Sequence, residues 1–337
     1  MNEAAAPSLL GTTFFDSMLG LAVRRWCAPV LGLEPHASAE DYLVRRQQLG
    51  TEASRLLVAA AGIEIFMIDT GVGDHRLCSP ADVAALAGGT AYEVVRLEAL
   101  AEDLLQSGTA VGDFAEAVEQ SLRESTAIAA KSIAAYRIGL DLPPIPPDED
   151  TLVAALAALR PTASGRYRIA DPVISAWLAW IAIKIKMPLQ FHVGYGDADM
   201  DLRQADPLRL TSFLRATEQF GVPVLLLHNY PFQRNAAYLA QVFGHVFMDI
   251  GLAVHNTGAL SQALIRETLE LVPFGKLLFS SDAYGLTEFY YLGAELFRRG
   301  LSTVLDELIK ADEMISQDAD HVASLIARDN ARRVYGL

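Results

Sequence analysis

The sequence predicts an α/β protein built as a (β/α)8 TIM barrel, preceded by an N-terminal helical segment. Two observations favour this fold. Short apolar runs alternate with longer stretches of helical length after residue 62, and the last four runs begin near residues 187, 222, 245 and 275. Apolar strands that alternate with helices are typical of a parallel sheet covered on both faces. The absence of a Gly-rich phosphate-binding pattern after the first run disfavours an open nucleotide-binding sheet.

Residues 1–62 form the predicted helical segment, which we expect to pack on the barrel. Three stretches carry apolar residues at intervals of three and four, and proline and glycine residues separate them; the stretches span residues 14–26, 39–49 and 51–62. This spacing predicts amphipathic helices. Residues 63–337 are then the barrel, a single catalytic domain.

Seven apolar runs in the barrel domain predict strands. They span residues 63–71, 92–99, 126–135, 187–194, 222–230, 245–252 and 275–283. A closed barrel has eight strands, so the count is one short at the front. The longest apolar stretch, residues 173–183, has eleven residues, which is too few to cross a bilayer, and we interpret it as a buried helix.

Composition narrows the function classes. The 337 residues are 52% hydrophobic and 20% charged, which excludes a disordered chain, and the net charge is −14. An acidic surface disfavours binding to nucleic acid or to anionic membranes. Two cysteines are too few for a disulfide scaffold, and the N-terminal residues lack the features of a signal peptide. We therefore expect a cytoplasmic enzyme with a small-molecule substrate.

Three predicted strands end in residues that can bind a metal. His192, His228 and Asp282 close the fifth, sixth and eighth strands, counting the missing strand as the first. Strand alternation predicts that His228 shares a face with Leu226, as His192 does with Gln190. The active site of a barrel lies at the carboxyl ends of its strands. Two imidazoles and a carboxylate suit Zn²⁺, Mn²⁺ or Fe²⁺.

Lys131 and Glu98 are ionisable residues in or beside apolar runs. The sequence leaves three roles open for Lys131: a carbamate that binds metal, a cation that holds a substrate carboxylate, or an ion pair with Glu98. Arg96 and Glu98 alternate and could form a buried pair instead.

Three more residues follow predicted strands. Arg137 comes just after the fourth strand, Arg234 follows His228, and His255 follows the seventh strand. Arg234 is either a bidentate partner of a substrate carboxylate or a solvent-exposed residue. His255 either contacts substrate or has a role in its loop.

Several segments closely resemble the amidohydrolase-related family of metal-dependent hydrolases, and in particular its FluG-like branch. The resemblance rests on PLQFHVGYGDADMDLRQADPLRL, VLLLHNYPFQRNAAYLAQVF, VFMDIGLAV, KLLFSSDAYGLTEFYYLGA and DNARRVYGL, and it runs from about residue 11 to the C-terminus. It implies a TIM barrel with His192 and His228 as metal ligands. Asp282 would be both a ligand and the general base for a metal-activated water, and His228 a ligand or an oxyanion donor.

The sequence departs from this family at one point. The family's first strand carries a His-x-His pair that supplies two metal ligands, and this sequence has no such pair. Met1 aligns after that strand, so strand one is missing either because the start is misassigned, which we favour, or because the chain has lost the strand. The chain as given should then bind metal weakly, and its exposed barrel edges allow a homo-oligomer.

The leading hypothesis is a metal-dependent amidohydrolase that cleaves a C–N bond, such as a γ-glutamyl-type amide. Zn²⁺ or a similar divalent metal would be its cofactor, and its substrate would carry a carboxylate. The expected substrate-binding residues are Lys131, Arg137, Arg234, His255 and Glu98. A metal-dependent decarboxylase of the same superfamily is one alternative. A catalytically inactive barrel that acts as a binding module is the other.

Overall fold

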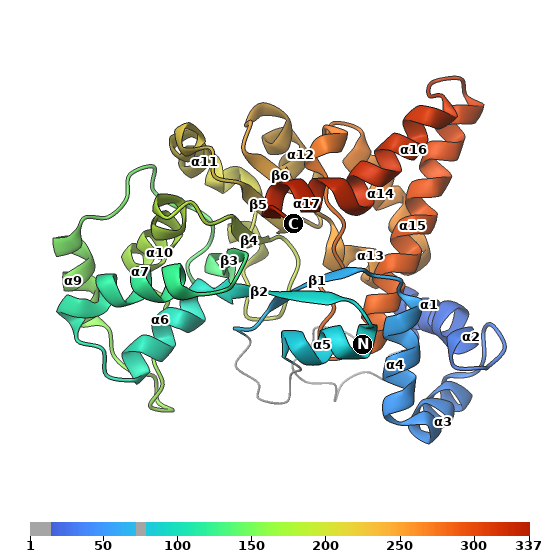
Figure 1. The fold of residues 1–337 in the computed structure, drawn as a ribbon, viewed down its shortest axis with the longest axis horizontal. Helices are drawn as coiled ribbons and strands as arrows, with labels where there is room; N and C mark the ends of the chain where they lie inside the picture. The colour runs from blue at the N-terminus through green and yellow to red at the C-terminus, as the bar shows by residue number, and fades with distance from the viewer. Residues whose placement is uncertain (1–14, 72–78) are drawn as a thin grey trace.

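The core of the structure is a curled sheet of six parallel strands whose order in space is their order in the chain, β1 to β6 (Figure 1). The computed structural model describes residues 15–71 and 79–337. The strands are β1 (Ile65–Asp69), β2 (Thr90–Arg96), β3 (Ala129–Ser132), β4 (Leu189–Val193), β5 (Val224–His228) and β6 (Val246–Met248). The α/β character and the parallel sheet are confirmed, whereas the closed eight-stranded barrel is not.

The predicted strand at 275–283 forms only one bridge, between Leu277 and Met248. The amide of Leu278 donates to the carbonyl of Met248, but the next amide, that of Phe279, donates to the carbonyl of Ile326. Successive amides of an extended segment point to opposite edges, so the carbonyl of Ile326, from the C-terminal helical region, occupies the edge that faces away from β6.

Helices follow most of the strands and cover the outer face of the sheet. They are α5 (Pro80–Ala87), α6 (Leu97–Gln106), α7 (Phe114–Glu124), α8 (Ala134–Arg137), α9 (Glu149–Ala158), α10 (Pro172–Lys184), α11 (Thr211–Thr217), α12 (Gln233–Val242), α13 (Gly251–Thr257), α14 (Ser261–Leu269), α15 (Thr287–Lys310), α16 (Ser316–Ser324) and α17 (Asn330–Tyr335). The apolar stretch 173–183 is the buried helix α10, as predicted. No helix among the described residues is long and apolar enough to cross a membrane.

The N-terminal helical segment packs against the far end of the chain. Its helices are α1 (Met18–Ala22), α2 (Ala28–Val30), α3 (Ala39–Leu49) and α4 (Thr51–Ala60), and α4 packs along α15 (Figure 1). A buried polar contact joins the two regions: Glu288, in the first turn of α15, accepts hydrogen bonds from Tyr42 at 2.9 Å and from Arg46 at 2.6 Å.

The two faces of the sheet bury different side chains. In the register of β4 and β5, Gln190 faces Leu225 and His192 faces Leu227. Leu225 and Leu227 belong to a small inner cluster that includes Tyr335 of α17, while their strand neighbours pack outward in the large core. The side-chain amide of Gln190 donates to the Tyr335 hydroxyl at 2.7 Å. His192 therefore lies on the inner face, at the carboxyl end of the sheet.

Candidate metal centre

Two imidazoles meet at the carboxyl ends of β4 and β5. The ring centroids of His192 and His228 are 4.5 Å apart, and both side chains are buried. Strand alternation does not bring them together, because the inner face of β5 is formed by Leu225 and Leu227, whereas Leu226 packs outward. The expectation that His228 shares the inner face with Leu226 is therefore wrong. His228 reaches His192 because its backbone is left-handed, with φ 73°, and has left the strand conformation.

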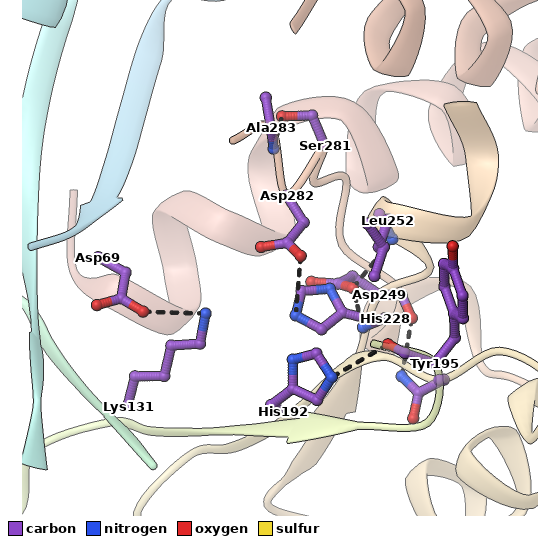
Figure 2. A network of polar contacts seen from close by, with 12 residues as sticks. Asp69, Lys131, His192, Tyr195, His228, Asp249, Leu252, Ser281, Asp282 and Ala283 are labelled. Atoms are coloured by element: carbon purple, nitrogen blue, oxygen red, sulfur yellow. Dashed lines mark hydrogen bonds and ion pairs between the residues drawn. The ribbon is translucent and has the colours of Figure 1, made fainter. Parts of the chain in front are cut away.

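Asp282 brings a carboxylate to the same point from the extended segment after β6. One of its oxygens lies 3.5 Å from Nε2 of His228 (Figure 2). Asp282 is also left-handed, with φ 50°. Two helices approach this segment closely at glycines: a Cβ on Gly293 of α15 would lie 2.7 Å from Cβ of Ser281, and one on Gly251 of α13 would lie 2.1 Å from Oγ of Ser280. The helices thus hold the segment that presents Asp282.

Both imidazoles are held in the neutral form that a metal ligand requires. Burial lowers the pKa of His192, and the neighbouring His228 lowers it further. Burial also lowers the pKa of His228, and the positive charge of Lys131 lowers it further. Nε2 of His192 lies 3.1 Å from the carbonyl oxygen of Tyr195, which can only accept, so Nε2 carries the hydrogen and Nδ1 carries the lone pair.

The side chains of His192, His228 and Asp282 are of the types that bind a divalent metal, but they do not lie close enough together to form a complete site. Both ring nitrogens of His228 are buried without a hydrogen-bond partner among the described residues. Such an imidazole is costly unless something binds it, and Zn²⁺ binds imidazole and carboxylate together. Within residues 15–71 and 79–337, however, no three His, Cys, Asp or Glu side chains are close enough to form a ready metal site. His192, His228 and Asp282 are therefore converging donors.

A cationic network lies beside the imidazoles on the strands β1 to β3. Nζ of Lys131 is 3.1 Å from a carboxylate oxygen of Asp69, and Nη2 of Arg96 is 2.5 Å from the same oxygen. In Figure 2 the ammonium of Lys131 lies between Asp69 and the two imidazoles. Lys131 and Arg96 therefore pair with Asp69, and neither forms the predicted ion pair with Glu98.

Glu98 instead makes hydrogen bonds that connect two elements of the fold. It lies in the first turn of α6, is almost fully buried, and accepts hydrogen bonds from Oγ of Ser132 at 2.7 Å and from the amide of Ile133 at 3.0 Å. Burial raises the pKa of its carboxyl group. The residue ties α6 to the end of β3, because strand β2 ends at Arg96 and the alternation that would point Glu98 inward stops there.

The other predicted substrate residues lie in three different settings. Arg137 is about nine-tenths buried, with Nη2 3.5 Å from Glu102 and with Nε and Nη1 lacking an acceptor among the described residues. His255 is buried on α13, stacked on Phe289 at 4.6 Å, with both nitrogens unpartnered in the described structure. Arg234 is exposed and paired with Glu270 at 2.9 Å, so the structure does not bring it to the other candidates.

Two residues near the site have no role in the sequence prediction. Asp249 follows β6, is buried, and accepts a hydrogen bond from the amide of His228 at 2.7 Å. It braces the left-handed turn that presents the imidazole. Tyr136 of α8 packs on His192 with ring centroids 4.6 Å apart. The sequence signal for both was their position, since Tyr136 comes directly after the predicted strand 126–135 and Asp249 is an ionisable residue within the predicted strand 245–252.

Comparison with known proteins matches the chain to one family. A model of the amidohydrolase family matches residues 58–337. The protein fluG of Emericella nidulans is 30% identical over 239 residues, which are 67% of this chain and 27% of that protein. The chain thus spans about a quarter of the length of that curated relative.

Solved structures show the same fold. A Lactobacillus casei protein assigned as a metal-dependent hydrolase is 27% identical, with a TM-score of 0.74, and the match covers 95% of this chain and 83% of that one. A uronate isomerase of Thermotoga maritima is 13% identical, with a TM-score of 0.64 over 98% of this chain and 80% of that one. The second likeness concerns the fold alone.

Proposed function

The chain belongs to the amidohydrolase family, and on that premise we propose that it is a metal-dependent hydrolase that cleaves a C–N bond, such as a γ-glutamyl-type amide, in a small substrate bearing a carboxylate. The observation that carries the proposal is the meeting of His192, His228 and Asp282 at the carboxyl ends of their segments. The similarity to an assigned metal-dependent hydrolase supports it.

His192, through Nδ1, and His228 would hold the metal together with Asp282. A divalent metal there would supply a Lewis acid strong enough to make water a nucleophile near neutral pH. The carboxylate of Asp282 is partly exposed, with 31% of its side-chain surface accessible, so it can take the proton of the attacking water. It can then return that proton to the leaving nitrogen, which must be protonated to depart as an amine.

Lys131 and Arg137 are the cations that we propose for the substrate carboxylate. Among the described residues, Asp69 is the one ion-pair partner of Lys131, and Arg96 shares it, so the three side chains carry an excess positive charge beside the imidazoles. Arg137 has unused N–H donors. His255, buried on α13 with both ring nitrogens unpartnered in the described structure, is the third substrate-binding residue that we propose. Arg234 and Glu98 are not included, because each is committed to partners elsewhere.

The experiment that tests the function measures metal and products together. The purified chain is loaded with Zn²⁺ or Mn²⁺, its metal content is measured by mass spectrometry, and a panel of γ-glutamyl and other carboxylated amides is screened for release of amine or ammonia. The variants His192→Ala and Asp282→Asn should lose turnover while keeping the melting temperature. Asp201→Asn is a matched control, because Asp201 lies in an exposed loop and pairs with Arg203.

Each alternative has its own outcome in the same assays. Release of CO₂ from the panel in place of amine would replace the hydrolase with a decarboxylase. A protein that takes up no metal and turns over none of the panel would be an inactive barrel with a binding role. Turnover that survives in His192→Ala or Asp282→Asn would overturn the assignment of the site.

A further inference from the structure

Tyr136 occupies a position at the rim of the site that the proposed function does not use. It lies in α8, the short helix that follows β3 directly. Its ring centroid is 4.6 Å from that of His192, so the imidazole of His192 contacts both Tyr136 and His228. The phenol is therefore adjacent to one of the converging donors, on the helix that leaves the sheet at the same end.

The loop after β4 is shaped around the Tyr136 hydroxyl. A Cβ on Gly196 would lie 2.0 Å from the hydroxyl oxygen, a distance that no side chain could tolerate, so glycine at 196 leaves room for the phenol. The amide of Asp197 lies 3.4 Å from the same oxygen and donates to it. The backbone of the loop thus holds the hydroxyl in place through its oxygen.

The hydrogen of this hydroxyl remains available. No described residue accepts a hydrogen bond from it. The neighbouring donors already have partners: Lys131 and Arg96 pair with Asp69, and Nε2 of His192 donates to the carbonyl of Tyr195. A phenol has an ordinary pKa of about 10, so the hydroxyl of Tyr136 is a neutral donor near neutral pH.

We propose that Tyr136 is a catalytic residue, whose phenol donates a hydrogen bond to the substrate oxygen on which negative charge accumulates during hydrolysis. This inference rests on the proposed function, since it concerns a reaction at His192, His228 and Asp282. A fixed donor aimed at a developing oxyanion stabilises the transition state more than the ground state. The donor is neutral and needs no rearrangement, because the loop backbone already fixes its oxygen.

The central test is Tyr136→Phe, which keeps the ring on His192 and removes the hydroxyl alone. Metal content and melting temperature should match those of the unchanged protein. Removing one such donor should lower kcat by roughly 10²- to 10³-fold with little change in KM. Inorganic phosphate, a tetrahedral oxyanion probe, should bind the metal-loaded variant roughly tenfold more weakly by calorimetry, the loss expected for one hydrogen bond.

A second variant reaches the same hydroxyl without altering Tyr136. Gly196→Ala displaces the phenol and should reproduce the loss of kcat, and the double variant should be no worse than either single one. Gly112→Ala is the matched control, because a Cβ at Gly112 meets nothing within 4 Å.

The outcomes separate this inference from the proposed function. Unchanged kcat and phosphate affinity in Tyr136→Phe, in a metal-loaded and active protein, would overturn the role of Tyr136 alone. A native protein that binds no metal and cleaves no amide would overturn the proposed function, and the role of Tyr136 with it.

Discussion

Nε2 of His228 lies 3.5 Å from a carboxylate oxygen of Asp282, and both residues have left-handed backbones, with φ of 73° and 50°. Neither residue is glycine, and such conformations cost about 1 kcal/mol or more each. Residues held this way cluster where function requires a side chain to point against the regular geometry. Here the strain turns His228 toward His192, and the amide of His228 is held by Asp249.

Replacing His228 should separate stability from metal binding. The variant His228→Asn keeps a residue that tolerates the left-handed region and removes a buried imidazole without hydrogen-bond partners. We expect the metal-free variant to be as stable as the native chain or about 1 kcal/mol more stable. Zinc at 100 times its dissociation constant should stabilise the native chain by about 2.7 kcal/mol, and the variant much less. Thermal melts with and without Zn²⁺ measure both effects.

The exposed His321 offers a control for this experiment. His321→Asn should leave the zinc-induced shift in melting temperature unchanged. An equal shift in His228→Asn and the native chain would show that His228 does not bind the metal.

Asp69→Asn should lower the free energy of unfolding at neutral pH and make that free energy less dependent on pH in acid. Burial alone would raise the pKa of Asp69, but the charges of Lys131 and Arg96 more than offset it and hold the pKa at about 2. Since the ordinary value is 3.8, the unfolded chain binds more protons between these two values. The ion pairs thus contribute about 2 kcal/mol above pH 4, and this contribution is lost as pH falls toward 2.

Urea unfolding at pH 7, 4 and 2.5 checks this prediction. The free-energy difference between the native chain and Asp69→Asn should shrink as the pH falls. A difference that stays constant with pH would mean that the carboxylate charge of Asp69 does not stabilise the fold.

His255→Phe should make stability less sensitive to mild acid. Burial lowers the pKa of His255 to about 4, although the charge of Asp282 acts in the opposite direction. Between the ordinary value of 6.5 and about 4, the unfolded state binds the proton and the folded state does not, so stability falls as the pH falls. Removing this one group should reduce the loss between pH 7.5 and 5 by about 2 kcal/mol.

Phenylalanine keeps the aromatic stack on Phe289, which limits other effects of the substitution. The measurement is the free energy of urea unfolding at the two pH values in the native chain and the variant. Identical pH slopes would contradict the assignment of a buried neutral imidazole at His255.

Glu288→Gln should weaken the attachment of the N-terminal helices. The variant keeps the shape of the side chain but removes the charge that pairs with Arg46, which is only partly exposed. We expect a loss of about 2 kcal/mol, less than for a fully buried pair. Glu307→Gln is the control, because Glu307 pairs with Arg266 at the surface and should cost less than about 1 kcal/mol. Equal effects of the two substitutions would contradict the anchoring role of Glu288.

The pattern of apolar residues predicted the strands that frame the site. It did not predict side-chain directions set by an irregular backbone, or contacts with residues that are distant in sequence. The runs that contain His192 and His228 form strands β4 and β5, as expected. The inward turn of His228 was not predictable, because a period of two assumes a regular strand and carries no sign of a positive φ.

The ion pairs show a second limit. Glu98 is close to Lys131 and Arg96 in the predicted pattern, but Asp69 is their partner, because the register of β1, β2 and β3 places Asp69 opposite Val94 and Arg96 opposite Lys131. Register between strands depends on packing along the whole sheet. The hydrogen bond from the amide of Phe279 to the carbonyl of Ile326 likewise joins segments that are distant in sequence.

The strand order has a consequence for how the chain assembles. Because each strand from β2 to β6 pairs with the strand made just before it, a nascent chain can extend the sheet one unit at a time. The N-terminal helices cannot dock in this order, because Tyr42 donates its hydrogen bond to Glu288, which lies 246 positions later in the sequence. Helix α3 is therefore synthesised long before α15 but docks late, because Tyr42 and Arg46 find their buried partner only when Glu288 has been made.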